Sequence, residues 1–128
     1  MDWKIDYNEA ADYVKVTCTG VFSISGHNRC AAKLFSSPFW KPGMRLIFDN
    51  RTFDFGKINL TELRSVSLYF ENMKDQLGDG KVALLMKSPH DFGIGRQFEM
   101  ISDDRLQCEI CVFYEEQKAL DWLLEDSF

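Results

Sequence analysis

The sequence has 128 residues, 45% of them apolar, and its 15 Lys and Arg against 20 Asp and Glu give a net charge of −5. A chain of this length folds around one core, so we expect a single domain over residues 1–128. The acidic balance argues against a nucleic-acid partner, because such a partner requires clusters of basic residues.

No targeting or membrane segment is evident in the sequence. The start, MDWKIDYNEA, lacks the basic and apolar regions of a secretory signal, and no apolar run approaches the roughly 20 residues that span a bilayer. We therefore expect a cytoplasmic protein whose cysteines are reduced and packed as small apolar side chains. The cysteines are Cys18, Cys30, Cys108 and Cys111.

The first elements are an expected β-hairpin and a helix. Residues 3–7 and 13–19 alternate apolar and polar side chains, which is the period of a half-buried strand. The five residues between them, NEAAD, suit a hairpin loop, so the two strands are predicted to be antiparallel. A helix is predicted over residues 23–37, with Ser23 as its cap.

The middle of the chain predicts two strands separated by a helix. Residues 44–50 and 81–87 are short apolar runs bounded by turn residues, as in strands that are buried on both faces. Between them, residues 51–57 are expected to form a loop, and Asn59 with Glu62 is a plausible capping pair for the helix that follows. That helix has apolar residues every three or four positions, at Leu63, Val66, Phe70, Met73 and Leu77, before the glycines Gly78 and Gly80.

The last elements complete an alternating α/β pattern. A helix is predicted to begin near Ser88, a strand is predicted at residues 107–114, and a closing helix at residues 115–128. After the hairpin, strands alternate with helices, which implies parallel strands joined by right-handed crossovers. The expected fold is an α/β domain with a mixed five-stranded sheet and four helices, a β-hairpin followed by βαβαβα repeats. The strand order does not follow from this pattern.

The segment KSPHDFGIGRQFEM, residues 87–100, has the strand–glycine–helix layout of a phosphate-binding loop. A dinucleotide fingerprint requires a third glycine where this chain has Phe98, and no Gly-Lys-Ser/Thr follows. The segment is better explained as a helix start, with Ser88 as the cap and Pro89 in the first turn. Gly95 would then allow the helix to approach the sheet closely.

Two other patterns resemble catalytic or metal motifs. His90 and Asp91 are adjacent, but neighbouring helix residues point about 100° apart and orient each other poorly. Cys108-x-x-Cys111 lies in a predicted strand, where residues three apart face opposite sides, so we expect structural thiols. His27 falls on the apolar side of its helix and is expected to be a core residue. We expect no metal and no cofactor.

A small polar group follows two of the buried strands. Asp49, Asn50 and Arg51 come directly after one strand, and Ser88 follows the next. Ligands of open α/β sheets bind beyond the carboxyl ends of parallel strands, so these four residues are the candidate ligand-binding or partner-binding site. Ordinary turn and cap chemistry is the alternative explanation.

Longer stretches carry a resemblance to a known family. The segments YVKVTCTGVFSISGHNRCAAKLFSSPFWKPGMRLIFDNR and KVALLMKSPHDFGIGRQFEMI, with the closing FYEEQKALDWLL, resemble the small bacterial proteins of SpoIIAA-like, or STAS, fold. The resemblance covers nearly the whole chain and implies a non-enzymatic regulatory or scaffold domain. Some similar proteins also resemble lipid-binding folds.

In the anti-sigma-factor antagonists of this fold, a serine in an Asp-Ser-Ser-Gly-like turn is phosphorylated by a partner kinase. This chain has GKINLTELRSV there instead, without that motif. Thr61 is nearest to the corresponding helix start, and Ser65 lies a turn further on, so the resemblance makes these two the candidate phosphorylation sites. A phosphate near a helix N-terminus is electrostatically tolerated.

Three functions follow as hypotheses. The first is a cytoplasmic protein-interaction module, expected to form a homodimer and to bind a protein partner through loop aromatics, although these could simply finish the core. The second is a module for a small apolar ligand or a membrane surface, with the Phe-rich loop RTFDFGKI flanking a pocket; the acidic charge disfavours anionic membranes. The third, an enzyme using Asp49, Arg51 or His90, ranks lowest because no nucleophile–base–orienter set can be named. The loop aromatics are Phe39, Trp40, Phe53, Phe55 and Trp122.

Overall fold

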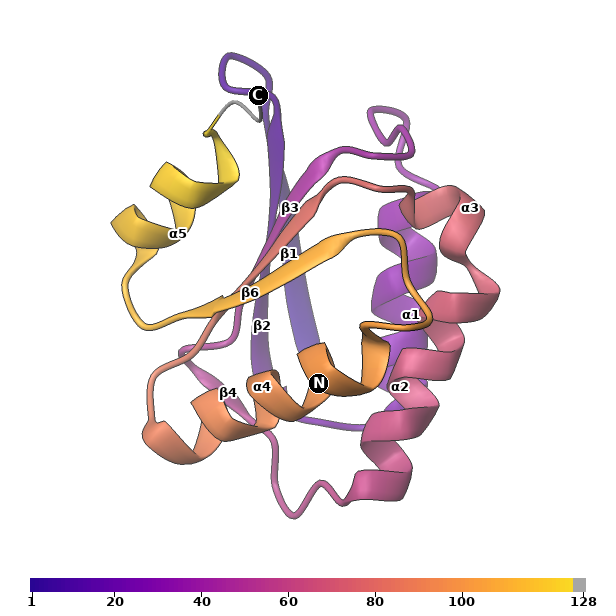
Figure 1. Cartoon of the computed structure of the whole chain (residues 1–128), viewed down its shortest axis with the longest axis vertical. Coiled ribbons are helices and arrows are strands. Elements are labelled where there is room, and N and C mark those ends of the chain that lie inside the picture. Colours follow the sequence, from indigo (N-terminus) through magenta and orange to yellow (C-terminus); the bar gives the residue numbers. More distant parts are fainter. Residues whose placement is uncertain (126–128) are drawn as a thin grey trace.

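The structure, a computed structural model, describes residues 1–125 as a mixed sheet with helices on both faces (Figure 1). The strands are β1 (Asp2–Asn8), β2 (Tyr13–Val21), β3 (Arg45–Asp49), β4 (Phe53–Asp54), β5 (Lys81–Leu85) and β6 (Glu109–Phe113). The helices are α1 (Ile24–Phe35), α2 (Leu60–Asn72), α3 (Lys74–Leu77), α4 (Pro89–Ser102) and α5 (Glu116–Leu123).

The sheet has the order β1-β2-β3-β5-β6, and the short strand β4 pairs with the end of β2. β1 and β2 form the predicted antiparallel hairpin, whereas the β2/β3, β3/β5 and β5/β6 pairs are all parallel. The mixed sheet with an antiparallel first strand is therefore confirmed. Apart from β4, strands that follow one another in sequence lie side by side, which is the simplest order that the helical crossovers allow.

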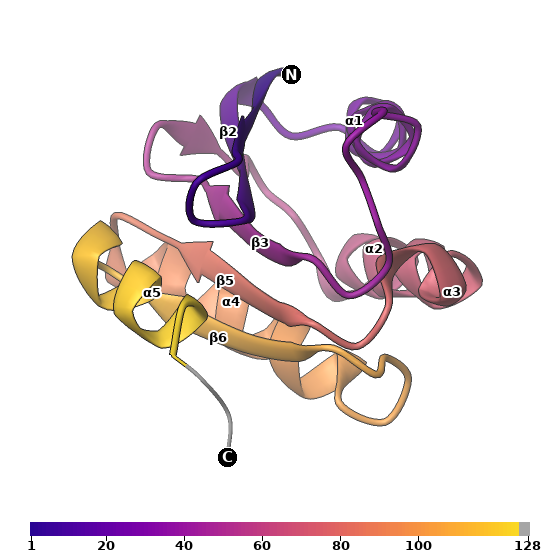
Figure 2. The same ribbon diagram turned by 90° about the horizontal axis from the view of Figure 1, so that it is seen from above.

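The two faces of the sheet are covered unequally. Side chains of α1, α2 and α4 share one large apolar core with the sheet, while α5 packs alone on the opposite face (Figure 2). Alternate residues of each strand contribute to the two sides: Val14, Val16 and Leu46 enter the large core, and Ile47 enters the small one beneath α5.

The helix starts form as the sequence predicts. The side-chain oxygen of Ser23 accepts a hydrogen bond from the Gly26 amide, and Asn59 with Glu62 makes a reciprocal capping box. Ser88 caps α4 by accepting from the Asp91 amide at 3.1 Å. The segment with the layout of a phosphate-binding loop is thus a capped helix start.

Gly95 lies where α4 comes close to the sheet. A Cβ atom at this position would sit 3.1–3.2 Å from methyl groups of Val112 and Met86, tighter than ordinary contacts. The close approach of helix and sheet expected from the sequence is therefore confirmed.

The structure differs from the predicted elements in four places. The segment expected as a loop after β3 contains β4, which continues the sheet beside the end of β2. The long middle helix breaks at Met73, after the poor helix former Asn72, and a separate turn, α3, follows. Cys108 precedes β6 instead of lying in it. The closing helix ends at Leu123, and the last three residues of the expected helix lie outside the described residues.

None of the five loop aromatics is a fully exposed side chain, and their role as interface anchors stays a prediction. Phe53 is buried, and the other four are half-buried against the two apolar cores. The Trp40 indole also donates a hydrogen bond of 2.8 Å to the Gln76 carbonyl. These residues finish the core, which was the alternative explanation.

The longest helix described, α4, has 14 residues, fewer than the roughly 20 that cross a bilayer. Within residues 1–125, no helix combines the length and the apolar character of a membrane span.

Gly80 and Gly93 give a matched test of how closely the backbone packs at Gly80. A Cβ atom on Gly80 would collide with the backbone of Gly43, whereas one on Gly93, in the exposed part of α4, would meet nothing within 4 Å. We expect Gly80→Ala to lower the free energy of unfolding by roughly 2–3 kcal/mol. Gly93→Ala should raise it by about 0.5–1 kcal/mol because alanine favours the helix. Urea unfolding followed by circular dichroism measures the free energy of unfolding of both variants. Equal effects of the two substitutions would contradict the close approach of Gly80 to the backbone of Gly43.

Candidate functional site

The carboxyl end of β3 carries a network of ion pairs on the α5 side of the sheet. Asp49 is only 6% exposed and accepts two hydrogen bonds from the Arg51 guanidinium, at 3.0 and 2.9 Å. The Arg51 amide donates a third, at 3.1 Å, and the Lys15 ammonium lies 3.6 Å from the same carboxylate. Asp49 therefore holds the turn after β3 in place.

Glu116, the first residue of α5, completes the network. Its carboxylate accepts from Lys15 Nζ at 2.8 Å and from Arg51 Nη2 at 3.1 Å. Two cations and two anions thus alternate between β2, the end of β3 and the start of α5. The arrangement is neutral as a whole, and it fastens α5 to the sheet instead of leaving a charge free for a ligand.

Opposing effects act on the Asp49 carboxyl. Burial alone would raise its pKa, but the hydrogen bonds from the Arg51 side chain and backbone, with the charge of Lys15, outweigh burial and hold the pKa below its ordinary value. Burial likewise works against the charge of Lys15, and the hydrogen bond to Glu116 reverses this and raises the pKa of Lys15. Asp49 and Lys15 therefore stay ionised at neutral pH.

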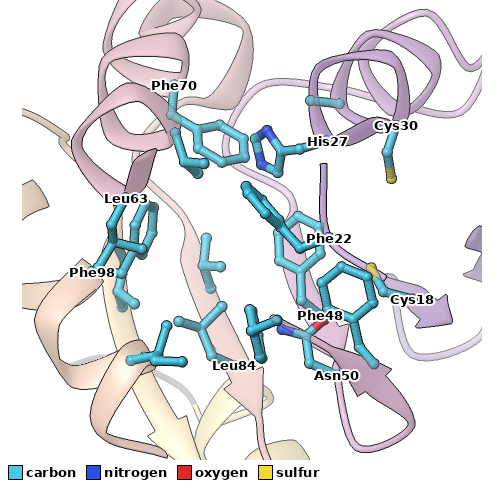
Figure 3. A pocket seen from close by; sticks show the side chains of 18 of the residues that line it. Cys18, Phe22, His27, Cys30, Phe48, Asn50, Leu63, Phe70, Leu84 and Phe98 are labelled. Atoms are coloured by element: carbon cyan, nitrogen blue, oxygen red, sulfur yellow. The ribbon is translucent and has the colours of Figure 1, made fainter. Parts of the chain in front are cut away.

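Asn50 points to the other face of the sheet, where the structure has an apolar cavity of about 100 Å³ (Figure 3). The cavity lies between the sheet and α1, α2 and α4 in the large core. Its lining includes Cys18, His27, Cys30, Ala31, Leu46, Phe48, Leu63, Val66, Phe70, Leu84, Met86, Ile94 and Phe98.

Three aromatic side chains border the cavity where β2 and β4 end, and two of them, Phe22 and Phe55, are partly exposed. Phe22, Phe53 and Phe55 belong to the lining, and their rings contact edge to face, with centroids 6.4 Å apart for Phe22 and Phe53 and 5.1 Å for Phe53 and Phe55. Ile58, just before α2, lies beside them in the lining. The Phe-rich loop thus flanks an apolar cavity, where the sequence led us to expect a pocket.

Among the described residues of the lining, His27 is the one with an ionisable nitrogen in its side chain. Its ring packs edge to face on Phe70 and Tyr69, with centroids 5.2 and 6.0 Å away, and Nδ1 lies 3.2 Å from the Asn28 side-chain oxygen. Burial lowers the pKa of His27 below the ordinary histidine value, so the ring is neutral at pH 7. It is partly buried and faces the cavity, in addition to its expected packing in the core.

Two cysteines from different elements meet in the same wall. Cys18 of β2 and Cys30 of α1 are buried free thiols within hydrogen-bonding reach. This contact, together with burial, raises the pKa of Cys18, and the same contact lowers the pKa of Cys30. Neither thiol is hydrogen-bonded to His27 in the described structure, and no three potential metal ligands gather within residues 1–125.

The cavity has an energetic cost while it is empty. At roughly 24 cal/mol per Å³, a void of about 100 Å³ in a core costs about 2 kcal/mol. Water fills such a space poorly, because a buried water needs two to four polar partners and this lining is almost entirely carbon and sulfur. An apolar molecule is the occupant that would remove the cost.

The structure separates the residues of the predicted polar site. Asp49 and Arg51 serve the ion pairs on one face, Asn50 borders the cavity on the other, and Ser88 is engaged as the cap of α4. Lys15 and Glu116, which sequence reasoning missed, are the remaining members of the network. In sequence, Glu115 and Glu116 at the start of α5 indicate only a favourable charge at the helix end, and an isolated Lys in an alternating strand gives no signal.

The candidate phosphorylation sites are both exposed on α2. Thr61 is the second residue of the helix, and the Ser65 hydroxyl, one turn later, donates to the Thr61 carbonyl at 3.0 Å. Their modification stays a prediction.

A second hollow, of about 360 Å³, lies at the amino ends of β3 and β5. It is more open than the apolar cavity, and its charged side chains, Arg45, Asp79, Lys81 and Glu109 among them, have both signs. That mixture favours no particular class of ligand.

Comparisons with known proteins establish the fold. The structure is similar to the crystal structure of an uncharacterised protein of the DUF3478 family, with a SpoIIAA-like fold, from Shewanella loihica PV-4. The TM-score is 0.63 at 16% sequence identity, over 95% of this chain and 92% of that one. No protein-family model matches the sequence, and no curated protein matches it significantly. The chain has a SpoIIAA-like fold, and at this identity the likeness carries no activity over.

The ion pairs predict a large effect of Asp49→Asn. This change should lower the free energy of unfolding at pH 7 by about 1–3 kcal/mol, because Arg51 and Lys15 lose a buried charged acceptor. Since the folded-state pKa of Asp49 is depressed, the stabilisation is present above the unfolded-state pKa, near 3.8, and is lost as the pH falls through the lower folded-state value. The difference between wild type and variant in urea unfolding should therefore shrink below about pH 4.

The control is Asp6→Asn, since Asp6 is exposed and only 3.7 Å from the exposed Lys4. We expect its effect to stay within about 0.5 kcal/mol. If Asp49→Asn were as mild as this control, the network would not fasten α5.

Proposed function

We propose that this domain is a non-enzymatic binding module that holds a small apolar molecule between the sheet and α1, α2 and α4. The observation that carries the proposal is the cavity itself: about 100 Å³ inside the large core, with a lining of apolar side chains from the sheet and three helices. Most domains of this size close such a space by packing.

The size of the cavity limits the ligand. Pockets for drug-sized molecules measure about 300–1,000 Å³, and an apolar cavity of about 150 Å³ holds benzene. A space of about 100 Å³ therefore suits a single ring or a short branched chain, with small movements of the bordering side chains. Phe22, Phe55 and Ile58 are partly exposed and could make those movements.

The chemistry of the lining supports binding over catalysis. The neutral His27 ring lies against Asn28 and aromatic rings, with no carboxylate among its described hydrogen-bond partners. The raised pKa of Cys18 keeps that thiol protonated. A catalytic site would need a nucleophile, a base and an orienting group in hydrogen-bonded sequence. As part of the same proposal the protein acts in the cytoplasm, which four free cysteines support.

A cavity-filling variant tests this proposal. Ala31 is buried in the cavity wall, so Ala31→Leu should occupy the space and raise the free energy of unfolding by about 0.5–2 kcal/mol. In wild type, benzene and toluene at millimolar concentration should raise the melting temperature and shift amide resonances of the lining residues. Ala31→Leu should abolish both responses.

The matched control is Ala119→Leu, because Ala119 is equally buried but lies in the small core beneath α5. There the larger side chain should destabilise by about 1–3 kcal/mol and leave the response to toluene intact. The proposal would be wrong if wild type bound none of these compounds and native mass spectrometry of the purified protein showed no bound molecule.

A regulatory protein-interaction module, self-associating as a homodimer, is the second candidate. It is favoured by two exposed apolar side chains on neighbouring helices, Leu68 of α2 at 49% and Met100 of α4 at 72%. Such exposure is common for single residues, so the pair supports this candidate less strongly than the cavity supports the first.

Light scattering after size-exclusion chromatography tests self-association across micromolar concentrations. If the α2–α4 surface mediates it, wild type should be dimeric and the double variant Leu68→Lys, Met100→Lys monomeric. Val21→Lys, which changes an exposed apolar residue of β2, is the control and should behave as wild type. A wild type that is monomeric throughout would exclude the homodimer.

A further inference from the structure

Asn50 is a buried polar side chain whose hydrogen-bonding capacity is largely unused. It is 7% exposed, and its backbone is fixed, since its amide donates to the Leu85 carbonyl at 2.9 Å and its carbonyl accepts from the Phe53 amide at 3.1 Å. Its side-chain Nδ2 donates only to the Met86 sulfur, at 3.9 Å, a weak acceptor. Within residues 1–125, no donor is hydrogen-bonded to its Oδ1.

The unused amide faces the apolar cavity. Asn50 belongs to the lining, and in Figure 3 its amide end points from the sheet toward the helix layer. Every fully buried side-chain nitrogen or oxygen described in residues 1–125 has a hydrogen-bond partner, so Oδ1 of Asn50, which has none, keeps some accessible surface. Closing that surface without supplying a partner would cost its hydration. An amide presenting both a donor and an acceptor to an otherwise apolar cavity matches a ligand that carries one polar group.

The lining also determines the charge of that group. Among the described residues, no lysine, arginine, aspartate or glutamate side chain borders the cavity. Burial holds the His27 ring neutral, and the amino nitrogen of Met1, another lining residue, lies beside Gly20 of β2. An ionised ligand would therefore be buried without a counter-charge, which is far more costly than burying a neutral polar group.

We propose that the cavity takes a neutral molecule of about one ring in size, bearing a single hydroxyl or carboxamide that hydrogen-bonds to the side-chain amide of Asn50. This inference rests on the proposed binding function and names the ligand class. A hydroxyl can donate to Oδ1 and accept from Nδ2, whereas a hydrocarbon satisfies neither and a carboxylate brings an uncompensated charge.

Phenol, toluene and benzoate test the proposal, because they have similar sizes and differ in the polar group. In NMR titrations of wild type at pH 7, phenol should bind about tenfold more tightly than toluene, and benzoate should not bind at detectable levels. Asn50→Leu keeps the approximate volume of the side chain and removes the amide. In this variant phenol should lose its advantage over toluene, and toluene should bind at least as well as to wild type.

A second measurement does not depend on the variant. The Asn50 side-chain amide protons of wild type should shift downfield with phenol, as expected for a new hydrogen bond, and should show no such downfield shift with toluene. Equal binding of phenol and toluene to wild type, tighter binding of benzoate, or an unchanged phenol preference in Asn50→Leu would each overturn the inference while leaving a ligand-binding cavity. Failure of all three compounds to bind, together with no bound molecule in native mass spectrometry of the purified protein, would overturn the proposed function as well.

Discussion

Consecutive side chains of a strand point to opposite faces of the sheet, and at the end of β3 this constraint places Asp49 and Asn50 on different faces. Asp49 turns toward α5, where Arg51, Lys15 and Glu116 surround it. Asn50 turns toward the helices on the other face, where it meets an apolar cavity. One charged and one neutral polar residue therefore lie next to each other in sequence and in separate environments, and neither could take the other's place.

The unequal covering of the sheet explains why the ion pairs matter. α5 has eight residues and contributes Ala119 and Leu123 as its buried side chains, so its apolar contact alone is small. Fastening its first residue to Lys15 and Arg51 adds charge-assisted hydrogen bonds where the apolar area is limited. The opposite face has three helices and a large core, and it can tolerate an empty space of about 100 Å³.

That tolerance has a limit. Domains of this size have about 5–15 kcal/mol of stability, so a void that costs about 2 kcal/mol is a considerable part of it. Leu, Ile or Phe at Ala31 would reduce the space, and the chain has a small side chain at this position instead. In the wall of this space, the side-chain amide of Asn50 makes one described hydrogen bond, to the Met86 sulfur, so an occupant could use its remaining hydrogen-bonding capacity.

The sequence predicts the parts of this structure that depend on local pattern. Alternation identified the hairpin, apolar runs identified the inner strands, and Ser23, Asn59 and Ser88 marked helix starts that the structure confirms. The Glu116 partners could not be predicted in this way, because Lys15 and Arg51 are 101 and 65 residues distant. The cavity could not be predicted either, since a void depends on the volumes of side chains from several elements together. The Phe-rich loop RTFDFGKI was the sequence feature that indicated a pocket, and in the structure this loop borders the cavity.

The two candidate functions share a physical connection in the loop between β4 and α2. Phe55 and Ile58 border the cavity, Asn59 caps α2, and Thr61 lies in the first turn of that helix. A ligand that displaced Phe55 or Ile58 on entering the cavity would also act on the start of α2, where the predicted phosphorylation site Thr61 lies. A ligand can shift an equilibrium between two arrangements of this loop only by the difference between its binding free energies for them. For a molecule the size of one ring, this difference in binding free energy is a few kcal/mol at most. It comes from the few side chains that must move.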